Sequence, residues 1–204
     1  MDIEICSSSD GNVESEVGAA YCGGAARIEL CSSMAEDGLT PTPGQIARAR
    51  EAFPDTPGLM VMIRPRPGNF HYSTEEQDQM TTQIVRTAEV GADGVVFGAL
   101  SENSNIDMRA VENCVRLSRS LGLKTTFHRA FDAAPQTDRS LDILIDIGVD
   151  RVLTSGIAWG QTGSALEGLD RLIRSIRARL ATPGFPPLQS SIFYQKSSIE
   201  PQHP

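Results

Sequence analysis

Short runs of apolar residues alternate with longer stretches that mix apolar and polar residues at helical spacing, from the start of the chain to about residue 180. The short runs predict strands and the longer stretches predict helices. The predicted strands are Asp2–Cys6, Arg27–Cys31, Leu59–Arg64, Gly94–Gly98, Lys124–Arg129 and Arg151–Thr154. The predicted helices are Val13–Cys22, Pro43–Ala52, Thr74–Val90, Met108–Leu121, Asp138–Ile147 and Ala165–Leu180. This succession of β/α units indicates a parallel sheet with helices packed against it.

Two α/β architectures contain such a sheet, the doubly wound sheet and the (β/α) barrel. A doubly wound sheet that binds nucleotides typically has a GxGxxG loop after its first strand, but here Cys6 is followed by Ser-Ser-Ser-Asp-Gly. Several predicted strands instead end in polar residues, as they do in a TIM-type barrel at the face that carries active sites. We therefore expect an α/β fold of the TIM type, an incomplete (β/α) barrel with about six β/α units over residues 1–181.

The β/α alternation stops near the C-terminal end. Residues 182–204 contain five prolines and no helical pattern, which predicts a disordered tail that adds no strand to the barrel. A complete barrel needs two further β/α units, so we expect the first and the sixth strand to be open edges. Open edges favour association into a homo-oligomer. A non-functional truncated product, from a splice variant or an altered reading frame, is an alternative interpretation.

The composition limits the partners of the chain. The formal net charge is −8 and aromatic residues make up 5%. An acidic chain is not attracted to a nucleic-acid backbone or an anionic membrane, and few aromatic residues argue against base stacking. No apolar run approaches the roughly 18 residues of a membrane span, and the acidic start of the chain is not a secretory signal. We expect a cytoplasmic protein with reduced cysteines.

The first two predicted strands share a Glu-x-Cys pattern. Because side chains alternate along a strand, Glu4 and Cys6 lie on one face, and Glu29 and Cys31 repeat this arrangement on the next strand. In a barrel the apolar face packs against the helices, so these four side chains face the interior. Neighbouring strands lie about 4.8 Å apart, so two thiols at matching heights could share a soft ion, for which Cu(I) is favoured. Buried cysteines with no metal role are the other interpretation.

Alternation also places Arg64 of the third strand and His128 of the fifth strand in the interior. Buried charges persist when they are paired, so we expect these two residues to form a polar network with Glu4 and Glu29. These four groups, with Asp132 after the fifth strand, are candidate acid–base residues of a barrel enzyme of unknown substrate. A purely structural ion-pair cluster is the alternative.

Three arginines at or after the strand ends are candidates for anion binding. Arg64 and Arg66 flank a proline in a loop fixed by further proline and glycine residues, and Arg129 follows His128. Guanidinium groups bind phosphate and carboxylate well. Solvated surface arginines, or a bridge from Arg129 to Asp132, are the alternatives. No set of nucleophile, base and orienting residue is readable, so no reaction is predicted.

Several segments occur together in one order along the chain. They are Arg27–Cys31, Val61–Arg66, Gly91–Leu100, Thr126–Asp132, Arg151–Gly156 and Ala165–Gly168. Together they resemble the CutC family over the chain up to about Leu180. The resemblance implies a TIM-barrel-like cytoplasmic protein of copper homeostasis that binds Cu(I), with Cys6 and Cys31 at the positions of the family's strand-end cysteines. The family continues with a Met-Pro-Gly-Gly-Gly-like strand and a final strand containing Phe-His, and neither follows Leu180 here.

Overall fold

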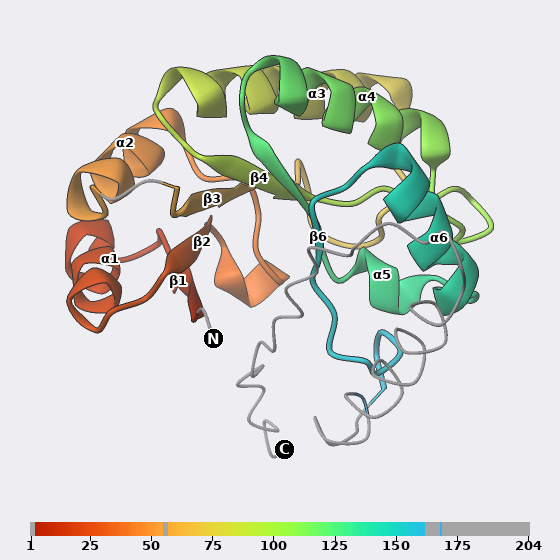
Figure 1. The fold of residues 1–204 in the computed structure, drawn as a ribbon, viewed down its shortest axis with the longest axis horizontal. Coiled ribbons are helices and arrows are strands. Elements are labelled where there is room, and N and C mark those ends of the chain that lie inside the picture. The colour runs from red at the N-terminus through yellow and green to blue at the C-terminus, as the bar shows by residue number, and fades with distance from the viewer. Residues whose placement is uncertain (1–2, 55–56, 162–167, 169–204) are drawn as a thin grey trace, which may run out of the picture.

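The computed structural model describes residues 3–54, 57–161 and 168, and these residues form one curved sheet with helices around it (Figure 1). The sheet has six parallel strands in the order β1-β2-β3-β4-β5-β6. The strands are β1 (Glu4–Ser8), β2 (Arg27–Cys31), β3 (Leu59–Met62), β4 (Gly94–Phe97), β5 (Lys124–Phe127) and β6 (Arg151–Val152). The longer helices lie on the convex side of the sheet, and the concave side is the interior of a half-barrel.

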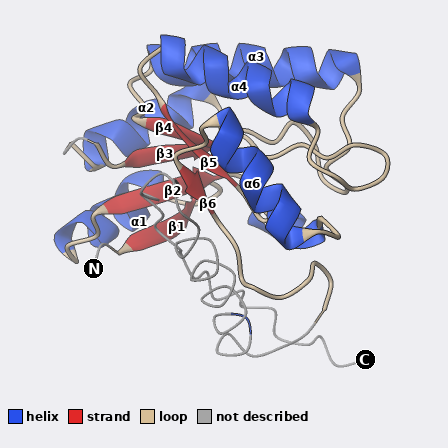
Figure 2. Cartoon of the chain, turned by 45° about the vertical axis from the view of Figure 1, so that its right-hand side comes forward, coloured by secondary structure: helices blue, strands red, loops and turns tan. Residues whose placement is uncertain are grey.

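Helices connect successive strands, and the longer ones cover the sheet from outside (Figure 2). They are α1 (Val13–Cys22), the 3-10 helix η1 (Met34–Glu36), α2 (Pro43–Ala52), α3 (Thr74–Glu89), α4 (Met108–Ser120), α5 (Ala130–Ala133) and α6 (Thr137–Ile147). None of the helices in the described ranges is long and apolar enough to cross a membrane.

Capping residues explain where the helices begin and end. At the start of α2, Thr42 and Gln45 form a capping box, in which each side chain accepts a hydrogen bond from the other's backbone N–H. Ser73 and Glu76 form the same arrangement at the start of α3. Such boxes satisfy backbone donors that the first helical turn leaves free. Gly148 follows α6 with φ of 85°, the left-handed conformation that ends many helices.

Apolar side chains pack on both sides of the sheet. The outer layer, between the sheet and α1 and α2, includes Val13, Val17, Ile28, Leu30, Ile46, Ala49, Leu59 and Val61. The inner layer, on the concave side, contains Cys31, Met60, Met62 and Val96, with Cys6 packed against them. Alternation along the strands therefore divides β2 and β3 between the two layers as expected.

Two aspartates form hydrogen bonds that connect the N-terminal ends of neighbouring strands. Asp93, just before β4, accepts hydrogen bonds of 2.7–2.8 Å from the backbone N–H groups of Gly58 and Leu59 and from the Arg50 guanidinium. Asp150, just before β6, accepts hydrogen bonds of 2.9 Å from the backbone N–H and the hydroxyl of Thr125 in β5. Each carboxylate therefore connects consecutive β/α units at the edge opposite the candidate site.

The structure confirms the expected fold class, an incomplete (β/α) barrel, but it moves several strand ends. β1 continues to Ser8 instead of ending at Cys6, whereas β3, β5 and β6 each end two residues earlier than predicted. At the end of β3, Arg64 has left the sheet because its backbone N–H donates to Thr40 Oγ1. The short helices η1 and α5 were not predicted, since three or four residues are too few to display helical periodicity.

In the part of the chain that the structure describes, β1 and β6 each pair with one neighbour only, so both are edge strands. The predicted helix Ala165–Leu180 and the predicted tail of residues 182–204 lie outside the described residues, apart from Gly168. The expected division into a domain of residues 1–181 and a tail remains a prediction.

Candidate metal centre on the concave face of the sheet

The first two strands carry the candidate metal centre. Their parallel pairing sets Cys6 opposite Glu29 and Ser8 opposite Cys31. The two cysteines are therefore staggered by two residues, and the expectation of matching heights is wrong. Strands of a barrel tilt and stagger relative to one another, and the pairing of β1 with β2 has this stagger.

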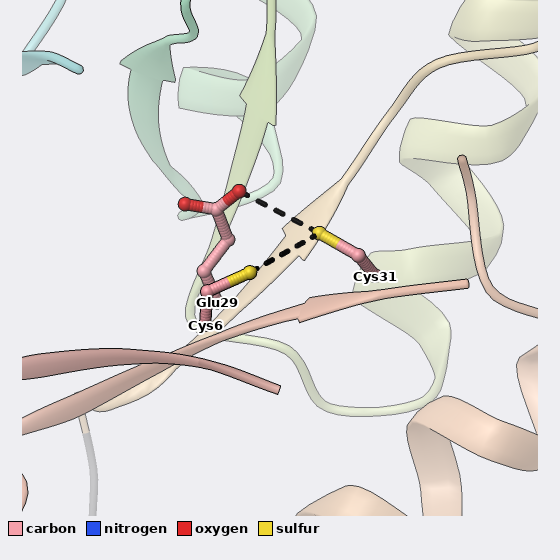
Figure 3. Close-up of side chains that lie close together, drawn as sticks. All are labelled: Cys6, Glu29 and Cys31. Carbon is pink, nitrogen blue, oxygen red and sulfur yellow. Dashed lines mark hydrogen bonds between the residues drawn. The ribbon is translucent and has the colours of Figure 1, made fainter. Parts of the chain in front are cut away.

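The cysteine side chains nevertheless converge (Figure 3). The Sγ atoms of Cys6 and Cys31 are 4.0 Å apart, and both residues are free thiols. Cys31 Sγ also lies 3.6 Å from Glu29 Oε1, to which the thiol donates. The two sulfurs and one carboxylate oxygen all lie within 4.8 Å of one another. The predicted proximity of the cysteines is confirmed, and Glu29 joins them.

Burial makes the proton-bound forms of this site unusually stable. The pKa of Glu29 is raised to about 7, mainly because the carboxyl is buried and also because the charge of Glu4 opposes its ionisation. The pKa of the Cys31 thiol lies well above its ordinary value, because the thiol contacts Cys6, is buried and faces Glu29. At neutral pH the metal-free site therefore holds Cys31 as a thiol.

Two methionines extend the sulfur content of the inner layer. Met60 and Met62 pack with Cys31, and Cys6 packs against the same group. Arg151 reaches across the concave face from β6, with Nη2 2.9 Å from Met60 Sδ. Four sulfur-bearing side chains from three adjacent strands thus share one buried layer.

The four predicted interior groups do not form one network, and that expectation is wrong for the described residues. Glu4 pairs with Arg27, whose Nε donates to Glu4 Oε2 at 2.9 Å. Glu29 accepts from Cys31, while Arg64 and His128 bond to backbone groups. The register explains the difference, because it sets Glu4 opposite Arg27 and supplies a cation from the adjacent strand.

The three predicted anion-binding arginines have different surroundings. Arg66 pairs with Glu76 at 2.5 Å, and Arg129 pairs with Asp132 at 3.0 Å and stacks on the ring of Trp159. Asp132, a predicted acid–base candidate, also accepts hydrogen bonds from the Thr154 hydroxyl and from the backbone N–H and hydroxyl of Ser155. Arg64 differs, since its guanidinium donates only to backbone carbonyls in the described structure.

Sequence reasoning missed Met60, Arg27 and Arg151. The alternation of side chains along a strand could have identified Met60 and Arg27. Met60 lies four residues before Arg64, and Arg27 lies two residues before Glu29, so alternation places each on the face assigned to the interior. Arg151 begins a two-residue strand, too short for any alternation to indicate its direction.

Comparison with known sequences identifies related proteins. Residues 1–182 match the profile of the CutC family. The family protein CutC of Bacteroides fragilis strain ATCC 25285 is 44% identical over 176 residues, which cover 86% of this chain and 65% of that protein. The corresponding protein of Vibrio campbellii is 40% identical over 182 residues, covering 88% of this chain and 70% of the relative. The chain thus spans less than two thirds of the length of the Bacteroides relative.

Solved structures show the same fold. A CutC protein of Streptococcus agalactiae, to which copper homeostasis is ascribed, superposes with a TM-score of 0.75 at 31% identity, over 87% of this chain and 82% of that one. Deoxyribose phosphate aldolase from Aeropyrum pernix has a TM-score of 0.53 at 20% identity, over 75% of this chain and 61% of that one. The aldolase shares the barrel fold alone. With a profile match over most of its length and close relatives at this level of identity, the chain belongs to the CutC family.

Proposed function

We propose that this protein binds Cu(I) through Cys6 and Cys31 and takes part in copper homeostasis in the cytoplasm. The observation that carries the proposal is the convergence of two free thiols at 4.0 Å on the concave face of the sheet. Thiolate and thioether ligands are soft and favour Cu(I) over the harder divalent ions. Membership of the CutC family supports the link to copper, and the name of the Streptococcus agalactiae relative refers to copper homeostasis.

The distance between the sulfurs fits a shared ion. With metal–sulfur bonds of roughly 2.3 Å, a sulfur–sulfur separation of 4.0 Å corresponds to an angle of about 120° at the metal. An angle of this size is trigonal and leaves a third position for another ligand. Met60 and Met62 offer thioethers in the same buried layer, and the Glu29 carboxylate offers an oxygen. Ligand softness favours a methionine in that position.

Metal binding at this site has to displace a proton. The Cys31 thiol is protonated in the metal-free protein because its surroundings raise its pKa, and metals bind the thiolate. The thiol donates a hydrogen bond to Glu29 in the metal-free protein. On binding, Cys31 would release its proton to solvent, and the positive charge of the ion would replace the proton beside the sulfurs. Cu(I) affinity should therefore rise with pH.

An anaerobic competition titration against a chromophoric Cu(I) chelator tests the proposal. The wild-type chain should bind one Cu(I) ion. Loss of a residue outside the ligand shell lowers metal affinity by roughly 10- to 100-fold, and the Cys6→Ser/Cys31→Ser variant, which loses two ligands, should lose more affinity than that. A Cys22→Ser/Cys114→Ser variant is the matched control, because it also removes two of the four thiols. Equal affinity in both double variants would reject Cys6 and Cys31 as the ligands.

The alternative prediction, a barrel enzyme with acid–base residues at the strand ends, has less support. Glu4 and Asp132 are both engaged by arginines, and barrel enzymes share this fold without sharing a reaction. Association of chains through the open edges β1 and β6 also remains a proposal, which size-exclusion chromatography can test. A non-functional truncated product would lack specific Cu(I) binding in the titration above.

A further inference from the structure

Arg64 is a buried cation at the end of β3, with 2% of its surface exposed. Its guanidinium donates to the backbone carbonyls of Glu36, Gly38 and Gly68 at 2.6, 3.2 and 2.9 Å. Within the described ranges no carboxylate pairs with it, and its Nε–H has no acceptor. Carbonyl dipoles hold the group in place, but they do not neutralise a full charge. A buried charge is costly unless a counter-charge accompanies it.

His128, at the end of β5, presents a second donor without an acceptor. Its Nδ1 accepts a hydrogen bond of 3.1 Å from the Ala130 backbone N–H, which fixes the proton on Nε2 in the neutral ring. The ring is neutral at physiological pH because burial, and then the charge of Arg64, lower its pKa to about 3. Nε2 is buried and has no partner among the described residues.

The imidazole of His128 lies against the backbone of Gly98. A Cβ atom at Gly98 would lie 2.6 Å from ring atoms of His128, so only glycine leaves the ring its present position. The hydrogen bond from the Ala130 backbone N–H restrains the ring in this position and fixes its tautomer. A donor held in this way loses little entropy when it binds an acceptor, which is the property expected of a preorganised site.

The guanidinium of Arg64 and the imidazole of His128 both lie against the ring of Phe70. The centroid of the Phe70 ring lies 5.3 Å from Arg64 Cζ and 5.0 Å from the His128 ring centroid. The Tyr72 hydroxyl is another buried polar atom with no hydrogen-bond partner among the described residues. Burial raises its pKa, and the nearby charge of Arg64 opposes this rise. Arg64 and Tyr72 thus follow β3, and His128 follows β5, so all three side chains come from the carboxyl ends of the strands. Barrel enzymes bind their substrates at this end.

We propose that Arg64 Nε and His128 Nε2 bind the carboxylate or phosphate group of a small molecule at the carboxyl end of the barrel. Among the described residues Arg64 has no counter-charge and neither donor has an acceptor, so the site favours a ligand group that carries negative charge on its oxygen atoms. Arg66 and Arg129 do not serve this purpose, since each is already neutralised by a carboxylate. The site does not depend on copper, because neither donor belongs to the cluster of Cys6 and its neighbours.

Protein labelled with ¹⁵N at histidine tests this site directly. Sodium phosphate and sodium acetate are titrated separately, and sodium chloride at equal ionic strength serves as the reference. We expect a saturable change in the His128 Nε2 signal with at least one of the two probes. Saturation by phosphate alone indicates a phosphorylated ligand, and saturation by acetate indicates a carboxylate. A response that never saturates, or that chloride reproduces, would overturn the proposal.

Variants identify the donors. His128→Leu should weaken binding of the active probe by about 10- to 100-fold, as expected for loss of a hydrogen bond to a charged group, whereas His128→Gln retains an N–H donor and should retain part of the affinity. Arg66→Lys is the control and should bind like the wild type. Thermal unfolding with and without probe gives the affinity of each variant that folds. Equal stabilisation of wild type and His128→Leu would contradict the proposal, and the wild-type titration decides the question if His128→Leu does not fold.

Discussion

Replacing Glu29 by glutamine should make the metal-free protein more stable at alkaline pH. The Glu29 carboxyl is buried on the concave face, 3% exposed, and Cys31 is its hydrogen-bond donor. Glutamine has nearly the same shape and retains an oxygen that accepts from the thiol. The substitution therefore removes the ionisation of residue 29 and little else.

The magnitude follows from the pKa of Glu29, which folding raises from 4.5 to about 7. Below pH 4.5 the carboxyl is protonated in both states and does not disturb folding. As the pH rises towards 7, the unfolded chain loses the proton and the folded chain retains it, so the stability of the wild type falls. A gap of about 2.5 pH units at about 1.4 kcal/mol each gives a loss of about 3 kcal/mol, complete just above the folded-state pKa.

Urea unfolding followed by circular dichroism, between pH 4 and 8 with a reductant and a metal chelator, measures this difference. The free energies of unfolding of wild type and Glu29→Gln should be similar near pH 4 and separate by up to about 3 kcal/mol at pH 8, with the variant more stable. Glu102→Gln, at an exposed position in a turn, is the matched control and should follow the wild type. Parallel pH curves for wild type and Glu29→Gln would refute the argument that Glu29 is buried and neutral.

Three further predictions use the same preparation. Gly98→Ala should destabilise the fold by about 1–3 kcal/mol in urea unfolding, because its Cβ would lie 2.6 Å from the His128 ring; an unchanged midpoint would contradict this packing. Asp93→Ala should cost about 3 kcal/mol, since it leaves two backbone N–H groups and a guanidinium on α2 without their acceptor. In maleimide labelling followed by mass spectrometry, exposed Cys22 should react in the native protein, whereas Cys114, buried with its pKa raised to about 12, should react only after unfolding.

Helices were easier to predict from the sequence than strand ends. The bounds of α1 and α2 agree with the expectation because Asn12 and Thr42 cap the helices through local hydrogen bonds. The end of a strand depends instead on whether its neighbour still offers a partner. β1 continues to Ser8 because Cys31 on β2 lies opposite it, and no local signal in the polar run after Cys6 indicates this.

The candidate site could also be predicted only in part, because some of its features are local to one strand and others depend on the neighbouring strand. Alternation along a strand assigns a side chain to a face, so the concave positions of Cys6, Glu29 and Cys31 were accessible from the sequence. The partner of each side chain depends on the register between strands, which the sequence does not specify. The stagger brings Arg27 beside Glu4 and therefore replaces the expected network with a separate ion pair.

The sequential order of the strands has a consequence for folding. Each strand from β2 to β6 pairs with the strand that precedes it in the chain, and α1 packs on α2 as α3 packs on α4. Such a molecule consists of neighbouring units joined by contacts of modest sequence separation, which resembles a repeat protein more than a fold closed by distant segments. During synthesis, a new β/α unit can dock on the one made before it as soon as it leaves the ribosome. The concave face of β1 and β2, with both site cysteines, can therefore form before the later strands exist.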